Sequence, residues 1–270
     1  MKRLLTAFLL IPAAWYLCKR APFSLFLAAM MLVAGAAVWE ALSLFASRGA
    51  RPFRVAGTIA ALALAWSFAA LPPRVDPMAV IAALVVLVPI AAMFGREDPG
   101  AMVESIAGTI VPVAIVGLGL AHCVALRAIP GENGSDLLLL ALVCVTFSDT
   151  GAYYVGSAFG SRRLAPAISP KKSWEGVFGG WAASLLGAAV AHFWFFQRLS
   201  AAHAIVLGTL LCAAGIAGDL TESLLKRAAG VKDSSGLLPG HGGVLDRVDS
   251  LMVAAPVLYY YWRVFLAGAI

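Results

Sequence analysis

Long apolar blocks alternate along this sequence with short segments that hold most of its charged, Pro and turn-forming residues. Most of the blocks approach the ~20 residues that an α-helix needs to cross a lipid bilayer. The pattern therefore predicts an all-α fold, a polytopic transmembrane helical bundle of about nine spans, with boundaries good to a few residues. The predicted spans cover residues 4–18, 23–46, 55–72, 77–95, 104–126, 136–159, 174–196, 201–222 and 249–267.

The first block leaves two interpretations open. Lys2 and Arg3 precede a short apolar run, as basic residues do in a signal peptide. No small-x-small cleavage site follows the run, which ends at Cys18-Lys19-Arg20. A retained span is therefore the favoured interpretation.

The composition agrees with a membrane protein. Hydrophobic residues make up 61% of the chain and charged residues 13%, whereas a soluble domain has about 25% charged residues. The four cysteines lie in apolar stretches without the spacing of metal ligands, so we expect reduced cysteines that serve in packing. A water-soluble fold is disfavoured.

The net charge of +6 does not indicate a nucleic-acid partner, because Lys and Arg lie between the apolar blocks. Membrane topology and anionic headgroups explain that placement. In the nine-span arrangement, fourteen of the 20 basic residues fall on the side of the N-terminus, which predicts that this side, with segments 160–173 and 223–248, faces the cytoplasm. The six basic residues on the other side are Lys19, Arg20, Arg74, Arg127, Arg198 and Arg263.

Polar residues within the predicted spans are concentrated in the C-terminal half. Glu40 and Glu104 each stand alone near a span end in the first half, and a functional role is the less favoured interpretation for both. We therefore predict an N-terminal region of variable transmembrane helices at 1–127 and a catalytic transmembrane region with cytoplasmic loops at 128–270. The acids of the second region that prompt this division are Asp149, Glu175, Asp219, Glu222, Asp246 and Asp249.

The densest polar segment runs from residue 219 to residue 249. On helices, Asp219, Ser223 and Lys226 share one face, and Asp246 and Asp249 share another at the start of the last span. A charge within a span costs at least ~2.5–3.5 kcal/mol, so several acids in adjacent helices imply mutual pairing, a wet cavity or a bound cation. Mg²⁺ is commonly shared between one or two carboxylates and substrate phosphates. We predict that Asp219, Asp246 and Asp249 bind Mg²⁺.

A glycine-rich loop lies between these acids. Gly240-His241-Gly242-Gly243 after Pro239 cannot hold a regular helix, and its glycines allow several N–H groups to turn toward one anion. Metal, loop and cations together indicate phosphoryl or nucleotidyl transfer. The nearby cations, which suit phosphate oxygens, are Lys226, Arg227, Lys232 and Arg247.

From Ser223 to Asp249 the sequence resembles the signature of the phosphatidate cytidylyltransferases, also called CDP-diacylglycerol synthases. That signature reads Ser-x-hydrophobic-Lys-Arg, four residues, Lys-Asp-x-small, two residues, hydrophobic-Pro, one residue, His-Gly-Gly-hydrophobic-x-Asp-Arg-hydrophobic-Asp, and every specified position fits. Two further family elements, Asp-x-x-Ala-Tyr-x-x-Gly and Ser-Pro-Lys-Lys-(Thr or Ser)-Trp-Glu-Gly, are matched from Asp149 and from Ser169, with Ser173 where Thr is common. The resemblance covers roughly residues 136–266.

The resemblance implies transfer of CMP from CTP to phosphatidate, giving CDP-diacylglycerol and pyrophosphate, with Mg²⁺ as cofactor. It also implies a homodimer in the lipid of a bacterial inner membrane, with the active site facing the cytoplasm. The number of ions, and whether a monovalent ion helps, stay open.

The resemblance further implies roles for individual residues. Lys226, Arg227 and the glycine loop around His241 would hold the triphosphate, and Ser169, Lys171 and Lys172 would hold the lipid phosphate. The expected catalytic residues are Asp219, Lys226, His241, Asp246 and Asp249. The expected substrate-binding residues are Asp149, Ser169, Lys171, Lys172, Glu175, Ser223, Arg227, Lys232, Asp233, Gly242, Gly243 and Arg247.

Some of these residues have structural interpretations as well. Asp149 could accept a hydrogen bond from the Tyr153 phenol one turn later, and Glu175 could stabilise a helix start whose N-cap is Ser173. Gly176 and Gly180 form a GxxxG pattern that favours a close helix contact. For His241, binding or orientation is favoured over acid–base chemistry, because an ionised phosphate needs no strong base.

Two rival functions are consistent with parts of the pattern. Acids inside spans also mark the ion pathways of transporters, although here they crowd into one half of the chain. A CTP-dependent kinase of lipid alcohols would also be polytopic and need a nucleotide site.

Overall fold

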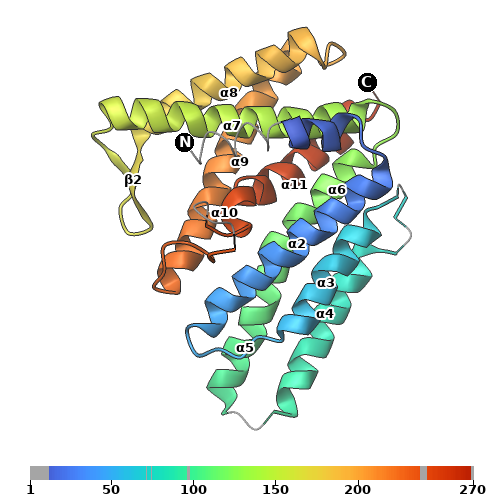
Figure 1. Cartoon of the computed structure of the whole chain (residues 1–270), viewed down its shortest axis with the longest axis vertical. Coiled ribbons are helices and arrows are strands. Elements are labelled where there is room, and N and C mark those ends of the chain that lie inside the picture. The colour runs from blue at the N-terminus through green and yellow to red at the C-terminus, as the bar shows by residue number, and fades with distance from the viewer. Residues whose placement is uncertain (1–11, 71, 74, 96–97, 238–241, 269–270) are drawn as a thin grey trace.

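The computed structural model describes residues 12–70, 72–73, 75–95, 98–237 and 242–268, and helices dominate it (Figure 1). Residues 12–19 are helical. A small antiparallel hairpin, formed by β1 (Arg163–Ala165) and β2 (Ser169–Ser173), lies between α7 and α8. The remaining elements are α2 (Phe23–Ala46), α3 (Arg54–Ser67), α4 (Pro77–Met93), α5 (Pro99–Pro112), the π-helical turn η1 (Val113–Gly117), α6 (Leu118–Arg127), α7 (Asn133–Phe159), α8 (Trp174–Trp194), α9 (Ala201–Ala228), α10 (Leu245–Val248), α11 (Leu251–Tyr261) and η2 (Trp262–Leu266).

The predicted all-α, polytopic fold is confirmed. Within the described ranges, five helical stretches are long and apolar enough to cross a membrane: α2, the continuous run of α5, η1 and α6, and then α7, α8 and α9. The apolar helices α3 and α4 are shorter, with 14 and 17 residues. Part of the first predicted span lies outside the described residues, so the number of nine spans stays a prediction.

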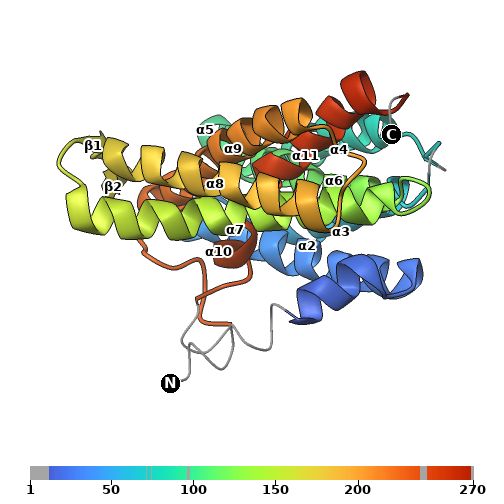
Figure 2. The same cartoon turned by 90° about the horizontal axis from the view of Figure 1, so that it is seen from above.

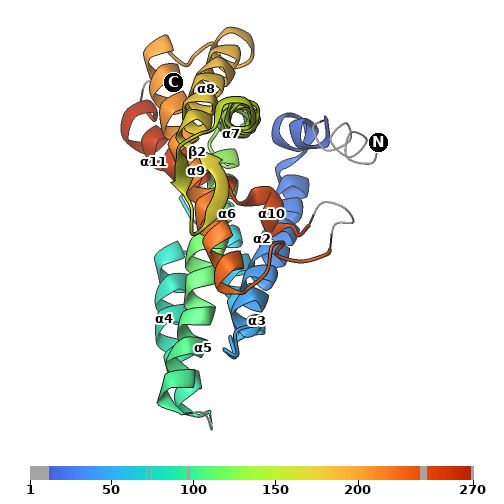
Figure 3. The ribbon, with the colours of Figure 1, turned by 90° about the vertical axis from the view of Figure 1, so that its left-hand side faces the viewer.

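The elements form two groups that cross each other. In Figure 1, α2 to α6 run side by side, while α7 crosses them and α8 follows it. Figure 3 shows α7 end-on beside helices that run along the page, and Figure 2 shows α8 lying along α7. The helices α9 and α11 pack between the two groups, where α11 contacts α6, α7 and α9. This places the turn between α10 and α11 against α9, where Asp249 and Ser250 face Gly218.

Glycines bring α7 and α8 into close contact. A Cβ atom on Gly151 would lie 2.6 Å from the carbonyl oxygen of Gly179, and one on Gly180 would lie 2.9 Å from that of Ser148. Gly176 likewise faces Gly156 at 3.4 Å. The GxxxG pattern therefore marks a close helix contact, as the sequence predicts.

Side chains link neighbouring segments at both ends of the bundle. At one end, Lys19 forms an ion pair with Asp136 at the start of α7, and Arg127 at the end of α6 donates to the Ala21 carbonyl. At the other end, the β hairpin contacts the last turns of α9, where Arg227 donates to the Ile168 carbonyl. The hairpin lies within segment 160–173, for which the sequence predicts a loop between two spans and no strands.

The cysteines match their expected role. All four, Cys18, Cys123, Cys144 and Cys212, are free and buried.

Gly179 tests the contact between α7 and α8. A Cβ there would lie 2.4 Å from the Val155 Cβ, whereas at Gly35 in α2 the nearest atom would be 3.4 Å away. We expect Gly179→Ala to lower the free energy of unfolding by about 1–3 kcal/mol through overpacking. Gly35→Ala should instead stabilise the protein by up to about 1 kcal/mol through helix propensity. Thermal unfolding in detergent measures both, and an unchanged midpoint for Gly179→Ala contradicts the close contact.

Candidate active site

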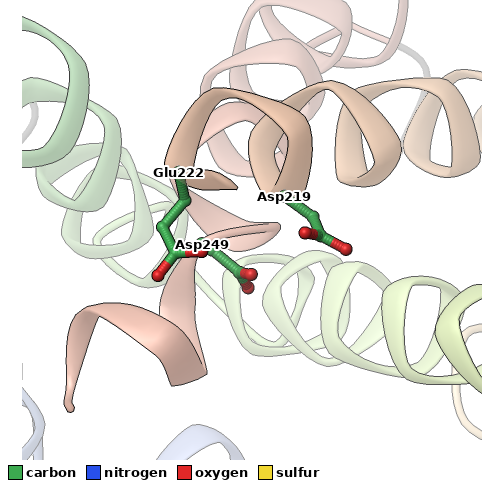
Figure 4. Close-up of side chains that lie close together, drawn as sticks. All are labelled: Asp219, Glu222 and Asp249. Carbon is green, nitrogen blue, oxygen red and sulfur yellow. The ribbon is translucent and has the colours of Figure 1, made fainter. Parts of the chain in front are cut away.

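Three carboxylates meet where α9 passes the turn between α10 and α11 (Figure 4). Asp219 and Glu222 lie one helical turn apart on α9, and Asp249 comes from the turn. One oxygen from each of the three groups lies within 4.8 Å of the others. Gly218 allows this approach, because a Cβ there would lie 2.3 Å from the Asp249 carbonyl oxygen.

A fourth carboxylate borders the cluster from α7. Asp149 interacts electrostatically with both Asp219 and Asp249. The alternative interpretation of Asp149 is wrong, because Tyr153 is 69% exposed, stacks edge-on against Tyr154 and forms no hydrogen bond with Asp149 in the described structure. Acids from three elements therefore surround one small volume.

Lys226, a cation on α9, pairs with acids in and beside the cluster. Its Nζ lies 2.5 Å from Glu222 Oε2 and 2.6 Å from Asp246 Oδ1. An ammonium group in contact with two largely buried carboxylates offsets part of their desolvation cost. Lys226 therefore supports the carboxylate cluster, and it is not a free point charge.

Asp246, one of the three predicted metal ligands, lies outside the cluster of Asp219, Glu222 and Asp249. Its Oδ2 accepts hydrogen bonds from the N–H groups of Gly243 at 2.7 Å and Ser234 at 3.0 Å. Burial opposes ionisation, yet these donors and the Lys226 ammonium hold the pKa of Asp246 below its ordinary value. Of the three predicted ligands, the structure groups Asp219 and Asp249, and it adds Glu222. The spacing of three residues between Asp219 and Glu222 was the signal for this addition.

The glycine loop binds carboxylates of the protein itself. The Gly243 amide donates to Asp246. The next two amides, those of Val244 and Leu245, donate to Glu40 on α2 at 3.1 and 2.9 Å. The expectation that Glu40 stands alone is wrong. Of the expected cradle, the Gly243 amide is taken up by Asp246. Pro239, Gly240 and His241 lie outside the described residues, so the role of His241 stays a prediction.

The β hairpin brings a second cation to the cluster. Lys172 Nζ lies 2.6 Å from Asp219 Oδ2. The hairpin, predicted to hold the lipid phosphate, therefore contacts the start of the 219–249 segment, which is predicted to hold CTP. Ser169 and Lys171 lie on the same strand, with Lys171 exposed. The hairpin thus lies at the edge of the carboxylate cluster.

Glu175 has a structural role in this hairpin. Its carboxylate accepts from the Ser161 hydroxyl at 2.7 Å and from the backbone N–H groups of Ser161 and Arg162. Ser173 caps α8 by accepting from the Gly176 N–H at 3.2 Å, as predicted. These bonds fix the base of the hairpin against the start of α8.

The other predicted residues lie on or beside α9. Ser223 donates to Asp219 Oδ1 at 3.2 Å, and Arg227 donates to the Val231 carbonyl at 3.1 Å. Lys232, Asp233 and Arg247 are exposed, and Gly242 has a left-handed backbone with φ of 76°. The histidines His122, His192 and His203 each contact an oxygen of a neighbouring residue away from the site, as expected of packing residues.

Proteins with similar sequences are known from several bacteria. A protein named phosphatidate cytidylyltransferase in Haemophilus influenzae is 47% identical over 134 residues, which are 48% of this chain and 46% of that protein. Proteins of the same name are 49% identical over 135 residues in Pseudomonas aeruginosa (50% of this chain, 49% of the relative) and 39% identical over 134 residues in Bacillus subtilis (50% of each). The chain spans about half the length of the curated relatives it matches.

The profile of the cytidylyltransferase family matches residues 1–265 of this sequence. The match includes the acidic helices of the site as well as the apolar helices that precede them. This chain, an integral membrane protein, therefore belongs to the cytidylyltransferase family.

Proposed function

We propose that this protein transfers CMP from CTP to phosphatidate. A phosphatidate phosphate oxygen attacks the α-phosphorus of CTP, the bond from that phosphorus to the bridging oxygen of the β-phosphate breaks, and pyrophosphate leaves with CDP-diacylglycerol as the lipid product. The observation that carries the proposal is the cluster of Asp219, Glu222 and Asp249, which joins the last residue of the signature-like segment to two acids just before it. The names of the bacterial relatives support the same reaction.

The donor set of the cluster fits Mg²⁺. Three carboxylates with oxygens within 4.8 Å of one another offer the hard ligands that this ion prefers. Asp219, Glu222 and Asp249 would hold it, and Asp149 adds negative charge beside them. When bound, the ion would neutralise charge on the reacting phosphates.

The cations around the cluster suit two phosphate-bearing substrates. Lys226 lies 2.6 Å from Asp246, which accepts from the Gly243 amide, and we assign Lys226 and the next residue of α9, Arg227, to the triphosphate of CTP. Ser169, Lys171 and Lys172 on β2 are assigned to the phosphate of phosphatidate. The contact between Lys172 and Asp219 supports this assignment, because the Lys172 Nζ lies 2.6 Å from a carboxylate of the cluster.

The membrane setting follows from the charge distribution. We propose a bacterial inner membrane protein whose active site faces the cytoplasm, where CTP is available, because most basic residues fall on the side of the hairpin and the 223–248 segment. From the family resemblance we also propose a homodimer.

The products of the reaction separate the proposed activity from its rivals. Purified protein in detergent with CTP, Mg²⁺ and phosphatidate should release pyrophosphate and form a CDP-lipid, and chelation of Mg²⁺ should stop both. CDP with a newly phosphorylated lipid alcohol would indicate the kinase. Saturable solute flux in vesicles without turnover would indicate the transporter.

Glu222 tests the carboxylate cluster. Glu222→Gln should raise the Mg²⁺ concentration needed for half-maximal turnover by at least about 10-fold, because it removes one ionised ligand. Glu132→Gln, which changes an exposed acid before α7, is the matched control and should leave the Mg²⁺ dependence unchanged. Pyrophosphate release titrated with Mg²⁺ measures both variants. An unaltered Mg²⁺ dependence in Glu222→Gln, with monodisperse protein, argues against this metal site.

A further inference from the structure

Glu40 brings a buried carboxylate from α2 to the segment that carries the candidate site. Only 5% of the residue is exposed. Its oxygens accept from the hydroxyl groups of Ser234 at 2.9 Å and Ser235 at 2.7 Å. They also accept from the backbone N–H groups of Val244 at 3.1 Å and Leu245 at 2.9 Å.

These four donors come from the two ends of one segment. Residues 234–235 lie before the glycine loop and residues 244–245 lie after it, so one carboxylate holds both ends together. An acid within an apolar helix is costly unless such donors compensate it. Removing the charge should therefore release the segment, while α2 itself keeps its backbone hydrogen bonds.

Ser234 connects Glu40 to Asp246. The Ser234 oxygen lies 2.9 Å from an oxygen of each carboxylate, and its single proton can be donated to only one of them at a time. Gly243 makes room for this arrangement, because a Cβ there would lie 2.1 Å from the Ser234 hydroxyl oxygen and 2.3 Å from Glu40 Oε2. Asp246 in turn binds Lys226, which contacts Glu222 of the carboxylate cluster.

We propose that Glu40 is a positioning residue of the active site. It holds residues 234–235 next to residues 244–245, so that the Ser234 and Gly243 N–H groups keep Asp246 against Lys226, and Lys226 stays against Glu222. The N-terminal helices therefore contribute a side chain that sets the geometry of the site without touching substrate. The effect of Glu40 on turnover rests on the function proposed above. Its role in holding residues 234–235 and 244–245 together does not.

Glu40→Gln tests the catalytic consequence. The variant should lower kcat by about 10-fold to 100-fold, because a displacement of about 1 Å at a reacting group costs on the order of 100-fold. Its KM for CTP should change by less than about threefold, since the residue acts through orientation. Glu104→Gln is the matched control, an exposed acid on α5 of the same N-terminal region, and should keep the wild-type kcat. Glu40→Asp, which retains the charge, should recover part of the loss.

Hydrogen–deuterium exchange tests the hold on the segment without any turnover. Peptides covering 242–248 should exchange faster in Glu40→Gln than in the wild type or Glu104→Gln, while peptides from α8 should not change. If Glu40→Gln does not purify as a folded protein, Ser235→Ala removes one donor and should show the same local increase. This readout stays valid if the wild type proves inactive with CTP and phosphatidate, which would refute only the proposed function.

Three outcomes overturn the proposal. Unchanged exchange over 242–248 would show that Glu40 does not hold the segment. An unchanged kcat in Glu40→Gln, with an active wild type, would show that the hold does not matter for turnover. A lower KM for CTP in that variant would show that the Glu40 carboxylate competes with the triphosphate for the loop amides.

Discussion

Gathering carboxylates among apolar helices is the constraint around which this structure is organised. Each ionised acid loses hydration there, and acids close together repel one another. Within the described part of the chain, Lys172 and Lys226 are the amines that contact the acids of α9, and they do not balance the combined charge of Asp219, Glu222 and Asp249 together with their neighbours Asp149 and Asp246. The excess of negative charge would favour the divalent cation proposed above and, through it, the phosphates of the proposed substrates.

The protein compensates its buried acids in two ways. Near the cluster, ammonium groups pair with carboxylates at 2.5–2.6 Å. Around the glycine loop, hydroxyl and N–H groups do so instead, since Glu40 and Asp246 take up the donors of residues 234 and 243–245. The ammonium groups of the lysine side chains can exchange one anionic partner for another without a change in the backbone. The second way fixes the backbone, because amide donors cannot move without moving the chain.

The sequence predicts most of the helices but only part of the site. Apolar blocks mark helices that contact lipid or the core, so α2 has the predicted bounds of 23–46. The helix α9 continues past the predicted end to residue 228, where Lys226 binds Asp246 and Arg227 donates to the Ile168 carbonyl. Asp219 and Asp249 were predictable from their spacing on the two polar helix faces. Glu40 was not, because 194 positions separate it from Ser234 and its surroundings in sequence are uniformly apolar. The hairpin also escaped prediction, since its short strands show no alternation of apolar and polar residues. The division at residues 127 and 128 stays a prediction.

The bond network of Glu40 crosses that division and bears on how the family can diversify. An exchange of the first 127 residues for those of a relative would preserve hydrophobicity and span number and still leave the loop amides without an acceptor, unless the incoming second helix carried an acid at the same depth. The two halves are therefore not interchangeable modules, and a chimera must inherit this acid together with the serines and glycine that receive it.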